Sequence, residues 1–400
     1  MRIGAGLLLA STVLFSGCSG FWNLPPGSGS GTGTTSTSLS SGPFFVIDQT
    51  TKQIVGYSIN SGTLSAISGG SATFLAAPQC IAIAPTGGFL YVGTVGGIYL
   101  YSIASSGALT AGSNGGIFNS GELPSAMQVD PSGSWLIAAY INGSSQVELD
   151  AIAISASNGS YTGAAGAALP SQTFNIANAA VKQIVISPDG ANVFVALGTG
   201  GTIIVPFNSG NSNPLGATAR TVAPLNSGGS ALSVAVDPTT RFFYIGETLA
   251  NSSANGGGLR VFSYGSLTSG TLTQISGSPI SSGGLAPNAI LPLASGSYVY
   301  VANGQGTSAA GNIAWFPLTA SGSTYTIAAG SSIASGIFPA GLAEDDEDNF
   351  VLAVSTGGST SSGNPDLEAY TMNSGALTAA VTSNTGTDPV GAVAIAALPK

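Results

Sequence analysis

Residues 78–92 read Pro-Gln-Cys-Ile-Ala-Ile-Ala-Pro-Thr-Gly-Gly-Phe-Leu-Tyr-Val, and this stretch decides the fold. It holds an alternating apolar segment, a turn at Pro85, and a second apolar segment that ends in Tyr-Val. Such alternation is typical of β-strands with one buried face. The pattern returns, in places weakly, in five further segments: Pro124–Gly133, Val181–Gly190, Ala231–Thr240, Pro287–Val301 and Pro339–Val354. A two-strand unit that recurs along the chain predicts a repeat architecture.

Two more strands follow the pair in each repeat. Gly97–Ile103 is followed by a Ser-Gly-x-Leu-Thr turn at Ser106–Thr110, and the same succession appears at 258–273 and 366–378. Repeats start at positions 78, 124, 181, 231, 287, 339 and 389, so their spacing runs from 46 to 57 residues. Four strands in about 50 residues is typical of one blade of a β-propeller.

The two ends of the chain complete one another. The last repeat begins at Pro389 and stops at Lys400 after a single strand. Its missing strands are found at Phe44–Asp48, Gln53–Ile59 and Gly62–Ile67. Pairing the ends would remove the open sheet edges of an unclosed array. We therefore expect an all-β, seven-bladed β-propeller over residues 43–400, with four-stranded antiparallel blades and one blade closed by N-terminal strands plus the C-terminal strand.

Composition excludes some classes of function. The chain is 44% hydrophobic and only 6% charged, with a formal net charge of −9. Nucleic-acid binding is not expected, because phosphates require clustered Lys and Arg. Histidine is absent, which removes the commonest acid–base group and metal ligand. No cofactor and no metal site is expected.

The N-terminal residues predict where the protein is targeted. Residues 3–15 form an apolar run that is too short to span a bilayer, and Ser16, Gly17 and Cys18 follow it. This resembles the lipobox of bacterial lipoproteins, which implies a signal peptide at 1–17 and a lipid on Cys18. The alternative is an ordinary secretory signal with a chance cysteine. Residues 18–42 are rich in Gly, Ser, Thr and Pro, as in a flexible tether.

These features predict an exported monomer held to a membrane through the lipid on Cys18. In the lipoproteins that the segment resembles, a residue other than Asp after the cysteine tends to go with the outer membrane, and here it is Ser19. The periplasmic face and the cell surface remain open alternatives.

The repeat itself resembles a known family. The Pro-x-x-apolar-x-apolar-x-Pro segment, the Tyr-Val pair and the Gly-x-Leu turn resemble the seven-bladed lactonase family, which includes 6-phosphogluconolactonase-like proteins and Tyr-Val-Thr-Asn repeat propellers. Tyr300-Val-Ala-Asn303 is close to the latter signature. The resemblance covers residues 44–400 and implies the propeller fold and lactone hydrolysis. Family members often carry His after the first Pro of the repeat, where this chain has Gln79, Ser125 or Asn288.

Repeat logic predicts where a site would lie. The turns between first and second strands should share one end of the propeller, and the loops that enter the first strand should share the other. The entering positions are Gln79, Ser125, Lys182, Leu232, Asn288, Ala340 and Val390. The positions that leave the second strand at the same end are Asp48, Thr94, Tyr140, Leu197, Glu247, Asn303 and Ser355.

Candidate site residues come from these two rings and from Arg260. Lactone hydrolysis needs a base to activate water, for which Glu247 and Asp48 are candidates. Candidate ligand contacts are Lys182, Gln79, Asn288, Asn303, Tyr140 and Arg260. The alternative for each of them is a solvated or turn-capping side chain.

Other acidic and thiol groups are interpreted structurally. Asp130, Asp189 and Asp237 neighbour the Pro of their turns, as turn residues do. The run Glu344–Asp348 replaces a turn and lacks the spaced pattern of a calcium loop, so a solvated turn is favoured over a cation site. Cys80 lies in an apolar strand and is interpreted as a small buried hydrophobe.

Three functions remain in competition. The first is a binding or scaffold propeller displayed at the cell envelope, with a glycan, a peptide or an envelope protein as ligand. The second is a hydrolase of an unphosphorylated sugar lactone, and the third is a structural envelope component. The sequence favours the first over the second, because His is absent and charge is sparse.

Overall fold

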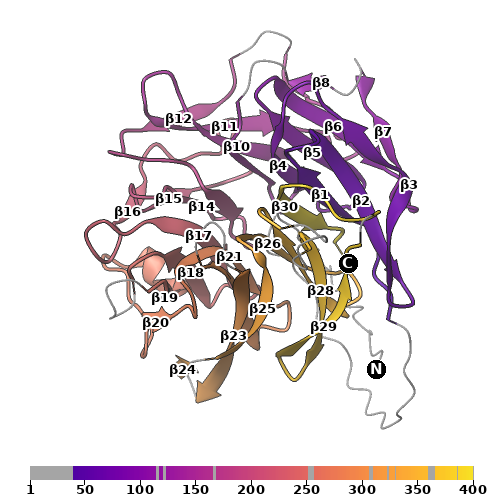
Figure 1. The fold of residues 1–400 in the computed structure, drawn as a ribbon. Helices are drawn as coiled ribbons and strands as arrows, with labels where there is room; N and C mark the ends of the chain where they lie inside the picture. Colours follow the sequence, from indigo (N-terminus) through magenta and orange to yellow (C-terminus); the bar gives the residue numbers. More distant parts are fainter. Residues whose placement is uncertain are drawn as a thin grey trace, which may run out of the picture.

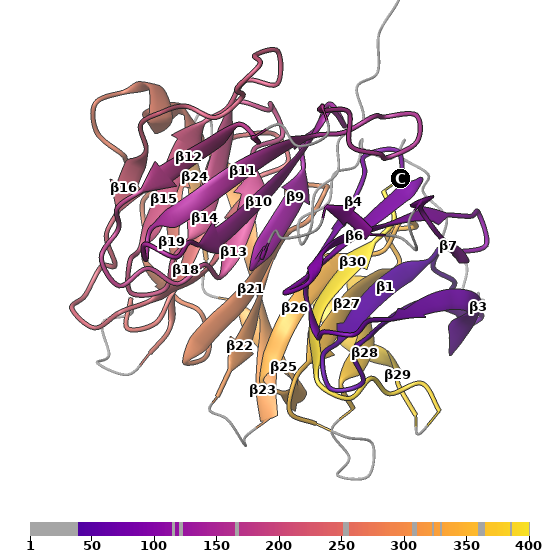
Figure 2. The same cartoon turned by 90° about the horizontal axis from the view of Figure 1, so that it is seen from above.

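The computed structural model describes residues 39–113, 117–119, 123–164, 168–250, 256–305, 310–321, 324–328, 330–358, 365–384 and 386–399. Seven antiparallel sheets stand around a central axis, as Figures 1 and 2 show. The predicted seven-bladed propeller is therefore confirmed. In the part of the chain described, no helix has the length and apolarity needed to cross a membrane.

Strands are named here blade by blade, starting with the innermost strand of each. The closing blade holds β30 (Ala392–Ala397), β1 (Phe44–Asp48), β2 (Gln53–Asn60) and β3 (Thr63–Thr73). The second holds β4 (Pro78–Ile83), β5 (Phe89–Thr94), β6 (Gly97–Ile103) and β7 (Leu109–Ala111), with β8 (Ile117–Asn119) also paired to β6. The third holds β9 (Ala126–Val129), β10 (Trp135–Ile141), β11 (Val147–Ala153) and β12 (Ser171–Phe174).

The fourth blade holds β13 (Gln183–Ile186), β14 (Asn192–Ala196), β15 (Thr202–Pro206) and β16 (Arg220–Val222). The fifth holds β17 (Ala231–Val236), β18 (Phe242–Glu247), β19 (Gly258–Ser263) and β20 (Ile280–Ser281), with the short 3-10 helix η2 (Tyr264–Thr268) after β19. The sixth holds β21 (Ala286–Pro292), β22 (Tyr298–Gly304), β23 (Ala310–Ser321), β24 (Thr324–Ile327) and β25 (Ser331–Ile337). The seventh holds β26 (Pro339–Glu344), β27 (Phe350–Ser355), β28 (Leu367–Asn373) and β29 (Ala376–Thr382).

Closure of the ring occurs as the sequence predicts. β1 pairs with β30 in antiparallel register, from Phe44 opposite Ala397 to Asp48 opposite Ala392. Neither chain end therefore leaves an inner strand unpaired. Since an unpaired edge invites association with other chains, this closure protects the fold.

The hydrophobic core lies between neighbouring blades. One cluster combines Ile137 and Ala139 of β10 with Val193 and Val195 of β14, all fully buried. Side chains of a strand alternate between its two faces, so each blade supplies apolar groups to the blades on both sides. The alternating sequence of every repeat thus produces a ring of sandwiched sheets.

In two blades the tyrosine of the Tyr-Val motif ties the blade to the next one. The Tyr91 hydroxyl in β5 donates a hydrogen bond of 2.8 Å to the Gly159 carbonyl, in the turn before β12 of the following blade. Tyr300 in β22 repeats this contact at 2.9 Å with Gly375, between β28 and β29. Gly375 has a φ of +83°, a conformation that favours glycine. The motif is therefore a structural latch.

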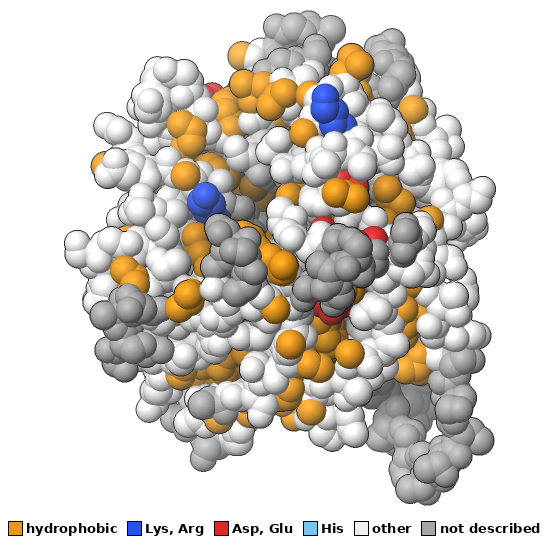
Figure 3. All heavy atoms as spheres, in the orientation of Figure 1, with side chains coloured by type: hydrophobic (Ala, Val, Ile, Leu, Met, Phe, Trp, Pro, Cys, Tyr) orange, Lys and Arg blue, Asp and Glu red, His pale blue; other side chains and the backbone are white. Residues whose placement is uncertain are grey.

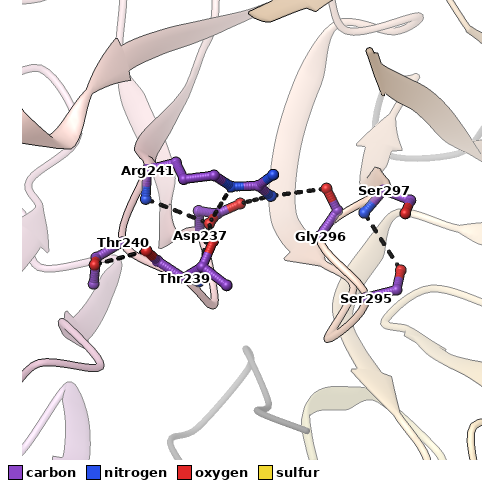
Figure 4. A network of polar contacts seen from close by, with 7 residues as sticks. All are labelled: Asp237, Thr239, Thr240, Arg241, Ser295, Gly296 and Ser297. Carbon is purple, nitrogen blue, oxygen red and sulfur yellow. Dashed lines mark hydrogen bonds and ion pairs between the residues drawn. The ribbon is translucent and has the colours of Figure 1, made fainter. Parts of the chain in front are cut away.

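The turns between first and second strands share one end of the propeller, here called the turn face. Figure 4 shows one of them: the Arg241 guanidinium forms an ion pair of 2.6 Å with Asp237 and donates to the Gly296 carbonyl of the next blade at 2.8 Å. Asp130 likewise accepts backbone N–H groups within its own turn. These contacts agree with the interpretation of the acidic residues as turn residues.

The acidic run 344–348 lies at the same end and contacts the start of the folded body. Asp346 accepts a hydrogen bond of 2.7 Å from the Gly42 N–H, and Asn349 donates to the Ser40 carbonyl at 2.8 Å. The Leu39 carbonyl accepts the Gly62 N–H. Residues 39–42 thus pack on the turn face, although the sequence analysis assigned them to the tether. Among described residues, no group of three or more His, Cys, Asp or Glu is placed to hold a metal ion.

Candidate functional site

A cavity lies on the propeller axis at the end opposite the turn face, here called the mouth face. It has about 630 Å³ of empty space, part of it open to solvent. Residues of β4, β9, β13, β21, β26 and β30, or directly before these strands, line it. Figure 3 looks onto this face and shows apolar side chains spread over its loops, with few charged ones.

Polar groups from four different blades meet at the cavity: Gln79, Ser125, Lys182 and Asn288. Its walls are apolar and include Ile81, Met127, Ile184 and Ile395. With Ala340, the four polar residues make five of the seven positions of the entering ring. Leu232 and Val390 are not among the lining residues. The repeat period places residues here because every inner strand begins at the same level.

Three of the polar groups have different surroundings. The Asn288 side-chain amide donates a hydrogen bond of 2.8 Å to the Pro339 carbonyl of the next blade, and this bond fixes the orientation of the amide. Gln79 exchanges weaker hydrogen bonds of 3.3 Å with Gln49 and with the Ala77 carbonyl. Lys182 is exposed, and no carboxylate in the described chain forms an ion pair with it. Its ammonium can therefore meet a ligand.

Glu247 and Arg260 are brought together, away from the cavity. Glu247 is fully buried. Its carboxylate accepts a hydrogen bond of 2.6 Å from the Arg260 guanidinium and one of 2.9 Å from the Leu225 N–H. Burial raises the pKa of Glu247, while Arg260 opposes the rise. Arg260 also donates to the Ala223 carbonyl and lies over the Phe262 ring. This pair anchors the loop before β17, and neither member lines the cavity.

Asp48, the second candidate base, is also buried outside the cavity. It accepts the Thr51 N–H at 2.9 Å and the Val390 N–H at 2.8 Å, and so holds the loop that enters β30. Asp366 supports the same loop through the Gly391 N–H at 3.1 Å. Burial, with Asp388 and Asp48 nearby, raises the pKa of Asp366 to about 6. Asp48 and Asp366 thus hold the loop that leads into β30, the strand that closes the ring of blades.

The remaining two candidates form hydrogen bonds to residues that do not line the cavity. The Tyr140 hydroxyl donates to Asp150 at 2.9 Å. The Asn303 amide donates to the Ser282 carbonyl and to the Asn312 side-chain oxygen at 3.1 Å. Neither residue lines the cavity. Cys18, the predicted lipidation site, lies outside the described residues.

Sequence reasoning missed several lining residues. Cys80, buried as expected, lies on the cavity wall, with its Sγ 3.5 Å from the Pro124 carbonyl. Gln183 also lines the cavity, and its side-chain oxygen accepts the Val234 N–H of the next inner strand at 3.0 Å. A polar Gln inside an apolar inner strand was the signal for this contact.

The arrangement suits hydrogen bonding more than proton transfer. Three amides and one hydroxyl can donate to and accept from a hydroxyl-rich ligand, and one ammonium can donate to it. The ammonium can also pair with a carboxylate or with a carbonyl oxygen that gains negative charge. Among the lining residues there is no Asp, Glu or His to take a proton from water.

Comparison with known families gives a match over nearly the whole chain. The family described as "Lactonase, 7-bladed beta-propeller" matches residues 34–393. Comparison with curated protein sequences gives no match.

Solved structures share the fold at low sequence identity. A 6-phosphogluconolactonase candidate from Bacteroides uniformis aligns with a TM-score of 0.65 and 17% identity, over 89% of this chain and 99% of that one. The periplasmic gluconolactonase PpgL of Pseudomonas aeruginosa aligns with a TM-score of 0.63 and 18% identity, over 90% and 100%. A further 6-phosphogluconolactonase candidate, from Bacteroides fragilis, gives 0.63 and 16%, over 92% and 99%.

Proposed function

The chain belongs to the seven-bladed β-propeller lactonase family, and from this premise we propose that its axial cavity binds a sugar lactone or the sugar acid derived from it. The observation that carries the proposal is the set of Gln79, Ser125, Lys182 and Asn288 at one mouth. Neutral donors and acceptors match sugar hydroxyls, and a single ammonium matches a lactone carbonyl or a carboxylate.

Binding without efficient hydrolysis is the function that this cavity supports best. Efficient hydrolysis of a lactone near neutral pH needs a positioned base. The carboxylates first considered for that role, Glu247 and Asp48, make structural contacts away from the cavity. Among the described residues that line the cavity, none could therefore act as a base on water beside a bound lactone.

Hydrolysis of the lactone at the same site is the second candidate. Family membership favours it, and so does Lys182, which can hydrogen-bond the oxyanion formed when water adds to the carbonyl. The ring C–O bond then breaks, and the released alkoxide takes a proton from solvent. Without a base, such turnover rises in proportion to hydroxide concentration and shows no bell-shaped pH profile.

One pair of assays separates the candidates. Ligand-observed NMR with gluconate and glucono-lactone reports binding, and pH-stat titration reports acid release from the lactone. Binding with no acid release above the solution rate supports the first candidate. Acid release that falls in Lys182→Gln but persists in Lys52→Gln supports the second. Absence of binding to either compound overturns both.

Export and lipid anchorage are a separate proposal, which rests on Cys18 and the apolar run before it. Residues 39–42 pack on the turn face, so a tether from Cys18 joins the body at the end away from the cavity. The proposal is tested by metabolic labelling with a fatty acid. Label should appear in the wild-type chain and vanish in Cys18→Ser, whereas equal labelling of both would overturn it.

A further inference from the structure

The inner strand β21 has a β-bulge at its start. Pro287 pairs with Asn303 and Ala289 pairs with Ala302, so Asn288 is an extra residue with no partner of its own in β22. The registers of β4, β17 and β26 shift in the same way near their first residues. A bulge disrupts the strand ladder locally and turns the extra side chain in a new direction. Asn288 lines the cavity from this bulge, so strand pairing alone does not determine how its side chain points.

A buried hydroxyl of the neighbouring blade holds the peptide bond that leads into this bulge. Ser233 in β17 is fully buried, and its hydroxyl donates a hydrogen bond of 2.7 Å to the Pro287 carbonyl. That carbonyl belongs to the peptide bond between Pro287 and Asn288, and a peptide bond is planar. A fixed carbonyl therefore fixes the direction of the Asn288 N–H and the place from which the Asn288 side chain starts. Ser233 itself is not among the residues that line the cavity.

The second blade repeats this contact with a thiol. Cys80 is the third residue of β4, as Ser233 is of β17, and its Sγ lies 3.5 Å from the Pro124 carbonyl of the next blade. Both side chains face a glycine of the second strand, Gly93 opposite Cys80 and Gly246 opposite Ser233. A Cβ on either glycine would meet the Sγ or Oγ atom, so each glycine leaves room for the donor. The chain thus uses one contact twice, each time one residue before a polar group of the cavity.

From these contacts we propose that Ser233 is a positioning residue of the binding site, whose hydroxyl aligns Asn288 so that the side-chain amide meets the hydroxyl groups of the ligand. This inference rests on the proposed function, because it concerns the same cavity. Two hydrogen bonds set the place of the amide: that of Ser233 to the Pro287 carbonyl, and that of the amide itself to the Pro339 carbonyl. The second N–H and the oxygen of the amide can then contact a ligand.

Gluconate affinity, measured by calorimetry on the full chain carrying Cys18→Ser, tests this role. Ser233→Ala removes the hydroxyl, and the affinity should fall roughly fivefold, the effect of one misplaced neutral hydrogen bond to the ligand. Ser233→Cys restores a donor of the kind that the chain uses at Cys80, and it should keep the affinity of the unsubstituted chain. In the Asn288→Ala background, Ser233→Ala should cause no further loss, because the amide that it positions is gone.

Gln128→Met is the matched control for a general loosening of the blades. The side-chain oxygen of Gln128 in β9 accepts the Ile186 N–H of β13, in the next blade, at 2.7 Å. This bond joins the inner strands of two blades, as that of Ser233 does, but neither Gln128 nor Ile186 lines the cavity. Gln128→Met should therefore lower the melting temperature and leave gluconate affinity unchanged. Melting temperatures also establish that each variant folds.

The outcomes distinguish this inference from the function beneath it. Unchanged affinity in a folded Ser233→Ala protein, an equal loss in Gln128→Met, or a further loss in the Asn288→Ala background overturns the positioning role and leaves sugar-acid binding intact. No binding of gluconate by the chain that carries only Cys18→Ser overturns both. If Ser233→Ala does not fold, Gly246→Ala displaces the same hydroxyl, because its Cβ would meet the Ser233 Oγ. It should give the same loss of affinity, and unchanged affinity there overturns the proposal.

Discussion

Replacement of Tyr300 by Phe removes one hydroxyl from a fully buried side chain and should destabilise the protein. That hydroxyl donates a hydrogen bond of 2.9 Å to the Gly375 carbonyl of the next blade. Its loss leaves the carbonyl without this donor in a place that water does not reach. The expected cost is about 1–2 kcal/mol of unfolding free energy, the usual range for an unsatisfied buried acceptor. Tyr91→Phe should behave in the same way, because its contact with Gly159 is equivalent.

The chain contains a matched control for this prediction. Tyr244 occupies the same motif position in β18 and is fully buried, but its hydroxyl has no hydrogen-bond partner in the structure. Removal of a buried hydroxyl that lacks a partner relieves a desolvation cost. Tyr244→Phe should therefore be neutral or stabilising. The measurement is urea denaturation followed by circular dichroism, with the three variants compared under one condition. Equal destabilisation by Tyr244→Phe and Tyr300→Phe would refute the latch interpretation.

Three further predictions concern titration, a buried ion pair and the candidate bases. Burial raises the pKa of Asp345 to about 7 and that of Asp366 to about 6, both above the ordinary 3.8. The folded state therefore binds these two protons more tightly than the unfolded state does. As a result, the free energy of unfolding should fall as pH rises from about 4 to 7. Melting temperatures at pH 5 and pH 8 check this, Asp345→Asn should flatten part of the slope, and a melting temperature that increases over this range would contradict it. Arg260→Met leaves the buried Glu247 carboxylate without its partner and should lower the free energy of unfolding, measured by urea denaturation, by about 3–5 kcal/mol. Glu247→Leu combined with Arg260→Met should recover part of this loss. A double variant that is less stable than Arg260→Met would contradict the pairing. Glu247→Gln should bind gluconate with unchanged affinity in calorimetry, because Glu247 lies outside the cavity, and a tenfold loss in a folded variant would place it in the site.

Most of the fold follows from the repeat. The Pro-to-Pro spacing of seven residues locates the first strand and its turn, and the partial repeats at the two ends locate the closing blade. The strand expected at Phe44–Asp48 is β1, with the same bounds. These features are predictable because neighbouring residues in sequence determine them: alternation, turn chemistry and repeat length.

The site was only half predictable, for a physical reason. The period places Gln79, Lys182 and Asn288 at the start of inner strands, where side chains reach the axis. The same period places Glu247 and Asp48 at the end of second strands, one strand further from the axis. There a charged side chain is buried, and it needs partners that the period does not reveal.

The contacts that the sequence did not predict join residues far apart in the chain or on different strands. Arg260 lies 13 residues after Glu247, on a strand that pairs with its own, and Val390 lies 342 residues from Asp48. No local pattern connects these residues.

Calorimetric titration of gluconate into the full chain carrying Cys18→Ser tests the central claim most directly, with Lys182→Gln and Lys52→Gln as matched variants. Both lysines are exposed at the mouth face, but Lys182 alone lines the cavity. A charge-assisted hydrogen bond contributes about 1.5–3 kcal/mol, so we expect one binding site whose affinity falls at least tenfold in Lys182→Gln and is unchanged in Lys52→Gln. Equal affinities in all three proteins, or no binding by the unsubstituted cavity, would contradict the account.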